Sequence, residues 1–83
     1  MRYFIFTSKA EDKQLAVVDL WKCEGAELQN HQETIIVKTD NGSIHVCIEN
    51  DKDRNSEFLR FTTELCKMED NDPLMMMIEE IRH

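Results

Sequence analysis

The sequence predicts an α+β fold: a small antiparallel sheet of three to four strands with two C-terminal helices packed on one of its faces. Three observations indicate this fold. A hairpin signal covers residues 34–49, apolar residues recur at helical spacing after residue 56, and Pro73 divides the helical region in two. The 83 residues have room for one domain, which we take to be residues 1–83.

The N-terminal third is expected to contribute strands. Residues 3–7 are apolar on both faces, which is typical of a strand buried inside a sheet. Residues 9–23 fit two structures: Ser8–Glu11 matches a capping box and favours a helix, whereas the Val and Trp content of residues 14–21 favours a strand. We favour the strand, because Leu15 would fall on the polar side of the helix, and keep the helix as the alternative.

The clearest local signal is a hairpin over residues 34–49, centred on Asn41 and Gly42. These two residues suit a type I′ turn, in which both central positions need a positive φ. A two-residue loop pairs Val37 with Val46 and leaves one face of the hairpin apolar. The apolar face consists of Ile35, Val37, Ile44, Val46 and Ile48.

Two helices are expected after an acidic loop over residues 50–55. The first runs from Ser56 to Met68, with Ser56 or Asn55 as its N-cap. Its apolar stripe is Phe58, Phe61, Leu65 and Met68, and its outer face is Glu57, Arg60, Glu64 and Lys67. The second covers residues 73–82, because proline suits the first position of a helix. Its buried stripe is Leu74, Met77, Ile78 and Ile81.

The residue content argues against catalysis. Gly25 and Gly42 are the only glycines and both fit turns, so the sequence has no glycine-rich phosphate-binding loop. It also has no G-x-S-x-G motif. His45 and Cys47 share one face of a strand at i and i+2, too far apart for a nucleophile–base hydrogen bond. We therefore predict no enzyme activity and no cofactor.

No metal site is predicted either. The spacings of structural zinc sites do not occur among the four candidate ligands, Cys23, His31, His45 and Cys47. Residues 51–55 resemble the start of a calcium-binding loop, but Ser56 replaces the turn glycine and Thr62 replaces the bidentate glutamate. We interpret residues 51–55 as a solvated connector.

The expected location is the cytoplasm, or the host cytoplasm if the protein is encoded by a phage. Residues 1–6 lack the apolar run of a secretory signal, and no apolar stretch approaches the roughly 18 residues of a membrane span. The three cysteines lack C-x-x-C spacing, which suits a reducing compartment.

The net charge of −7 predicts partners with basic surfaces. Residues 1–23 carry four basic and three acidic side chains, whereas residues 24–49 and 50–83 each carry a net charge of −4. We therefore predict a non-catalytic inhibitor or regulator that covers a basic, nucleic-acid-binding type of surface on another protein. The candidate contacts are Glu24, Glu27, Glu69, Asp70, Asp72, Glu79 and Glu80.

Two further interpretations accompany this prediction. Met75 and Met76 lie off the buried stripe of the second expected helix, so they are candidates for a homodimer or partner interface. The alternative function is a small RNA- or DNA-associated regulator that uses the weakly basic N-terminal sheet. By analogy of size, charge and fold class alone, the chain is similar to the small acidic antagonists of phages and mobile elements, such as anti-defence proteins, immunity proteins and antitoxins.

Overall fold

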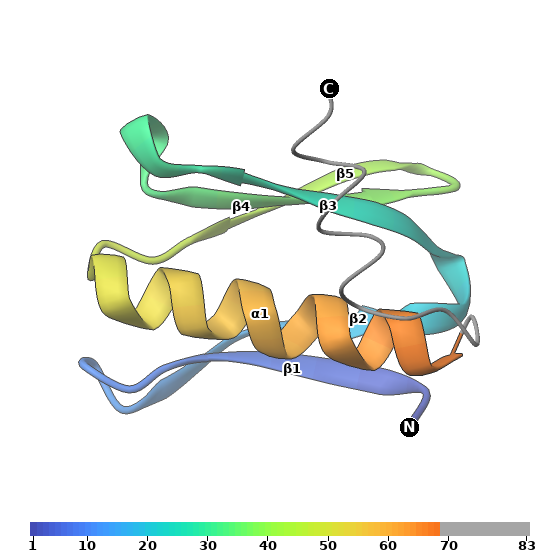
Figure 1. Ribbon diagram of the computed structural model, residues 1–83, viewed down its shortest axis with the longest axis horizontal. Helices are drawn as coiled ribbons and strands as arrows, with labels where there is room; N and C mark the ends of the chain where they lie inside the picture. The colour runs from blue at the N-terminus through green and yellow to red at the C-terminus, as the bar shows by residue number, and fades with distance from the viewer. Residues whose placement is uncertain (69–83) are drawn as a thin grey trace.

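Five antiparallel strands in two sheets, followed by one helix, make up residues 1–68, the part of the chain that the structure, a computed structural model, describes (Figure 1). In chain order the elements are β1 (Tyr3–Ser8), β2 (Lys13–Asp19), the 3-10 turn η1 (Leu20–Lys22), β3 (Cys23–Gln29), the 3-10 turn η2 (Asn30–Gln32), β4 (Thr34–Thr39), β5 (Gly42–Cys47) and α1 (Asp51–Met68). β1 pairs with β2, and the second sheet has the order β3-β4-β5. α1 contacts both sheets and lies between them. The α+β class is confirmed, but the expected single sheet with helices on one face is wrong.

The described part of the chain contains one α-helix, and this helix begins earlier than predicted. α1 starts at Asp51 because Asn50 caps it: the Asn50 side-chain oxygen accepts a hydrogen bond of 3.0 Å from the Asp53 N–H. Asp51 and Asp53 also stabilise the start of the helix, because their negative charges lie in the first turn, at the positive end of the helix dipole. Residues 51–55 are therefore the first turn of a helix and not a connector. The second expected helix, over residues 73–82, lies outside the described residues.

The predicted hairpin is confirmed as β4 and β5, with a register that differs by two residues. Val37 pairs with Ile44 and not with Val46. The positive φ falls on Gly42 (124°) and not on Asn41, so the predicted type I′ turn is wrong and the loop lies one residue earlier. A shift by two residues leaves every side chain on its original face. The face of Ile35, Val37, Val46 and Ile48 is therefore buried as predicted, and Ile44 stays partly exposed.

The N-terminal hairpin resolves the ambiguity over residues 9–23 in favour of the strand, β2. Phe4 and Phe6 of β1 are buried, whereas Tyr3 and Ile5 are exposed. The prediction that β1 is buried on both faces was therefore wrong. A two-stranded hairpin has one face on the core and one face in solvent.

β3 was missed because its sequence resembles a loop. Two glutamates and a glycine disfavour a strand, and the pairing with β4 is irregular between Cys23 and Gly25. Gly25 therefore lies in a strand and not in the predicted turn.

The hydrophobic core lies between the two sheets and α1. It comprises Phe4, Phe6, Val18, Leu20, Cys23, Ile35, Val37, Val46, Ile48, Phe61 and Leu65. The Phe61 ring lies 5.2 Å from the Phe4 ring and 5.1 Å from the Phe6 ring, which joins the helix to the first sheet. Of the predicted helical stripe, Phe61 and Leu65 are buried, Phe58 is partly buried and Met68 is exposed.

Candidate functional site

Two of the predicted partner-binding residues, Glu24 and Glu27, lie in the described part of the chain. Both are exposed on β3, about 10 Å apart along the strand. The Glu27 carboxylate lies 3.9 Å from the Lys38 ammonium group and also accepts a hydrogen bond from Gln29. The structure therefore does not gather the two glutamates into one acidic group. The other predicted residues lie outside residues 1–68: Glu69, Asp70, Asp72, Met75, Met76, Glu79 and Glu80.

The β1–β2 turn, η2 and the start of α1 lie at the same end of the molecule (Figure 1), and acidic residues occur in or next to each of them. The Ala10 N–H donates to the Asp53 carboxylate at 2.9 Å, and the Ile48 N–H donates to the Glu33 carbonyl oxygen at 2.9 Å. These bonds hold the three segments together. We call this surface the acidic end, defined by Glu11, Asp12, Glu33, Glu49, Asp51 and Asp53. The only signal for it in the sequence is the acidic loop expected over residues 50–55, of which we interpreted residues 51–55 as a solvated connector.

Over residues 1–68, carboxylates without an ion-pair partner outnumber cations without one. Six of the nine basic side chains in this range form ion pairs: Arg2–Asp19, Lys13–Glu11, Lys38–Glu27, Arg54–Asp51, Arg60–Glu57 and Lys67–Glu64. Six carboxylates in the same range have no ion-pair partner, namely Asp12, Glu24, Glu33, Asp40, Glu49 and Asp53, against three lysines, Lys9, Lys22 and Lys52. The described surface therefore offers more free negative than free positive groups.

Arg2 forms the centre of a second surface, on the outside of the first sheet. Its guanidinium carbon lies 4.0 Å from the centre of the Trp21 ring and 5.2 Å from that of Tyr3. Two of its nitrogens donate to the Asp19 carboxylate, at 3.2 and 3.4 Å. This hydrogen bonding raises the pKa of Arg2 and lowers the pKa of Asp19 below its usual value, so both groups stay charged at neutral pH.

Asp19 also fixes the turn that follows β2. Its carboxylate accepts a hydrogen bond of 3.0 Å from the Trp21 N–H and caps η1. Its carbonyl oxygen accepts a bond of 3.3 Å from the Cys23 thiol, and burial raises the pKa of that thiol. The sequence predicted a weakly basic surface on the N-terminal sheet, but no local pattern predicts that Arg2 lies beside Trp21.

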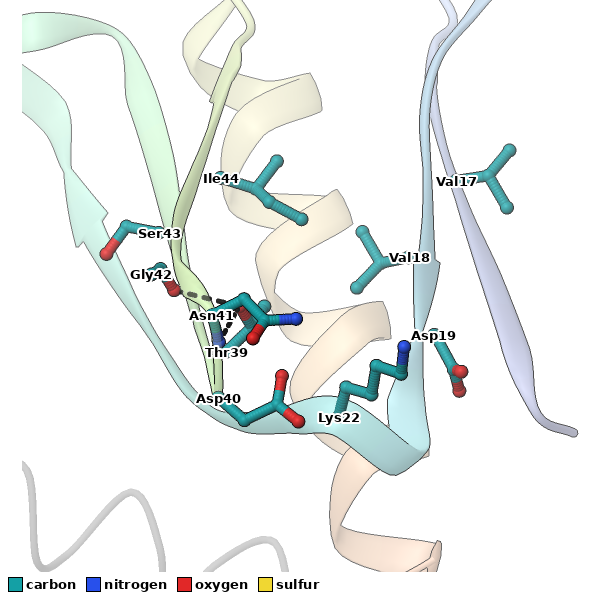
Figure 2. Close-up of a pocket in the computed structure, with 10 residues that line it drawn as sticks. All are labelled: Val17, Val18, Asp19, Lys22, Thr39, Asp40, Asn41, Gly42, Ser43 and Ile44. Carbon is teal, nitrogen blue, oxygen red and sulfur yellow. Dashed lines mark hydrogen bonds between the residues drawn. The ribbon is translucent and has the colours of Figure 1, made fainter.

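A groove of about 300 Å³ separates the edges of β2 and β5 (Figure 2). Val18 and Ile44 point toward each other across it, while Val17 points away. The β4–β5 turn at its mouth is held by the Thr39 hydroxyl, which donates to the Gly42 carbonyl oxygen and accepts from the Asn41 N–H. The groove lining includes two hydroxyl side chains but neither histidine nor cysteine.

Comparison with protein-family models, with curated proteins and with solved structures found no match to this chain. Among the described residues, no three His, Cys, Asp or Glu side chains are grouped to hold a metal ion. In the same range, no helix combines the length and apolar composition needed to cross a membrane.

Proposed function

We propose that this protein is a non-catalytic inhibitor or regulator that binds and covers a basic surface of a partner protein, of the kind that binds nucleic acid. The observation that supports it is the charge balance of residues 1–68, where most cations are held in ion pairs and half of the carboxylates are not. Small acidic antagonists, such as anti-defence proteins, immunity proteins and antitoxins, are proteins of this general type.

The acidic end is the surface we propose for first contact. Arg54 belongs to the same segment, but it is buried, with hydrogen bonds to the Ile48 carbonyl oxygen at 2.7 Å and to the Asn30 side chain at 3.0 Å. Arg54 also pairs with Asp51, so it neutralises that carboxylate and adds no free cation to the surface. The acidic-end carboxylates without an ion-pair partner therefore outnumber the nearby unpaired lysines, Lys9 and Lys52. A negative surface steers a basic partner and raises the association rate more than the affinity.

The test begins with affinity capture of the partner from cells that express the protein. Association of the purified pair is then timed for wild type and for the double variant Glu33→Lys, Glu49→Lys. We expect an association rate about tenfold lower for the variant, because two exposed carboxylates become cations. Raising the salt from about 50 mM to about 300 mM lowers the wild-type rate in the same direction.

The matched control is the opposite reversal, Lys9→Glu with Lys52→Glu, in the same segments. This variant is expected to associate as fast as wild type or faster. Equal rates for all three proteins, at low and high salt, would show that the acidic end does not steer the partner. The captured protein must also lose its nucleic acid when the acidic protein binds, since the proposal requires that both occupy one basic surface.

A second candidate function, an RNA- or DNA-associated regulator, is favoured by the surface around Arg2. Tyr3 and Trp21 are both exposed there, and aromatic rings stack on unpaired bases. Asp19 already neutralises Arg2, which leaves few cations for phosphate groups. If the protein binds RNA directly, with an affinity that falls steeply as the salt concentration rises, this second function is supported. If it instead binds a basic protein in competition with RNA, this second function is rejected.

A further inference from the structure

Four large apolar side chains are exposed on the solvent side of the β1–β2 hairpin and the turn that follows it. We call this surface the outer face, defined by Tyr3, Ile5, Val17 and Trp21 with the Arg2–Asp19 ion pair. Trp21 is 65% exposed, Val17 59% and Tyr3 54%. Contiguous exposed apolar surface marks interaction sites, and Trp, Tyr and Arg carry much of the binding energy at interfaces.

The outer face is continuous. Ile5 pairs with Val17 across the hairpin, and Tyr3 pairs with Asp19 at the next outward position. The Arg2 guanidinium then contacts the rings of both Tyr3 and Trp21. The apolar side chains therefore form one surface that a single partner can cover.

The charges of the outer face suit a second copy of the same chain. Two copies with a net charge of −7 repel each other, so they meet best where each is least negative. On the outer face the Arg2 charge is balanced by Asp19, so this surface carries no excess of negative charge. The acidic end, by contrast, presents four carboxylates without an ion-pair partner, which would repel their counterparts on a second copy: Asp12, Glu33, Glu49 and Asp53.

We propose that two copies of the chain associate through the outer face, in a symmetric dimer that buries the same four apolar side chains of each copy. Strands of six and seven residues make a ribbon about 20 Å long, which offers a few hundred Å². Stable interfaces bury about 800 Å² on each partner. The dimer is therefore weak, with a dissociation constant on the order of 10 μM or higher, and it separates on dilution.

Sedimentation equilibrium of the full chain, from about 1 μM to about 1 mM, tests the proposal. We expect a monomer that converts to a discrete dimer as the protein concentration rises. The substitution Val17→Lys is expected to raise the dissociation constant of the dimer at least tenfold. The matched control is Leu59→Lys on α1, where the side chain is 53% exposed and lies outside the outer face. This control keeps the wild-type constant. Salt strengthens the dimer because it screens repulsion between acidic copies, whereas it weakens binding to a basic partner.

A second readout needs no variant, because Trp21 is the only tryptophan of the chain. Acrylamide quenching of its fluorescence decreases at least twofold between the dilute and the concentrated protein if the outer face is buried. A monomeric mass throughout the concentration range, or quenching that is independent of concentration, overturns the proposal. A dimer that survives Val17→Lys but is lost in Met75→Glu with Met76→Glu also overturns it, because association then uses another surface.

Discussion

The buried carboxylate of Glu57 stands where a neighbouring strand would otherwise pair with β1. It is only 2% exposed, and it accepts a hydrogen bond of 3.0 Å from the Thr7 N–H. Arg60 pairs with the same carboxylate at 2.8 Å and donates to the Ile5 carbonyl oxygen at 2.6 Å. Unpaired strand edges invite pairing with other chains. Two side chains of α1 thus cover this edge and fasten the helix to the first sheet.

Replacing Glu57 by alanine is expected to destabilise the fold by about 2–4 kcal/mol, because the Thr7 N–H loses its acceptor and Arg60 loses its ion-pair partner. Glu57→Gln keeps an acceptor and costs less, about 1–2 kcal/mol. Urea unfolding followed by circular dichroism measures both losses. The control is Glu64→Ala, which removes an exposed pair with Lys67 and costs less than about 0.5 kcal/mol. Equal losses at Glu57 and Glu64 would contradict the role given to the buried carboxylate.

Helical periodicity correctly predicted two buried residues of α1, but it did not predict how much of the helix surface the rest of the fold covers. The spacing of Phe61 and Leu65 identified two residues that are indeed in the core. The same pattern placed Glu57 on the solvent side, which is wrong, because it assumes that one face of the helix is covered. α1 lies between two sheets and is buried over a wider arc. The buried charge of Glu57 is compensated by Arg60 and by the Thr7 N–H at the edge of β1, and the contact with β1 is visible only in the folded structure.

Local signals also explain which strands were predicted. The hairpin of β4 and β5 depends on a turn and on alternation, both of which are visible within sixteen residues. β3 carries neither signal and owes its place to pairing with β4. The division into two sheets and the contact of Arg2 with Trp21 join distant parts of the chain. The predicted contacts Glu24 and Glu27 came from charge composition, which gives no spatial grouping, so the acidic end was found only in the structure.

Phe61 is expected to be the most sensitive core position of α1, because its ring contacts both phenylalanines of β1. Phe61→Ala removes a fully buried ring and is expected to cost about 3–5 kcal/mol. Small domains are stable by only about 5–15 kcal/mol, so much of this variant unfolds on mild heating. Thermal unfolding by circular dichroism measures the loss. Leu59→Ala, on the exposed side of the same helix, is the control and shifts the midpoint little.

We expect the stabilisation that the Arg2–Asp19 ion pair provides to be lost at acidic pH. Hydrogen bonding to Arg2 lowers the Asp19 pKa in the folded state. The stabilisation is therefore fully present above the unfolded-state pKa and is lost as the pH falls through the folded-state value. We expect wild type to be more stable than Asp19→Asn at neutral pH, with a difference that shrinks as the pH falls below about 4, the ordinary pKa of an aspartate. Urea midpoints of both proteins across this range measure it, and a difference that does not change with pH rejects the ion pair as its source.

The three cysteines are expected to react with thiol reagents in a fixed order. Cys47 is exposed on β5, whereas Cys23 and Cys66 are buried. Burial also raises the Cys23 pKa, which lowers the fraction of reactive thiolate. Brief treatment of the native protein with iodoacetamide at neutral pH should therefore add one label, at Cys47, and treatment in urea should add three. Mass spectrometry of intact and digested protein counts and locates the labels. Cys47→Ser, the control, should stay unlabelled until it unfolds; native labelling at Cys23 would show that the turn capped by Asp19 opens in solution.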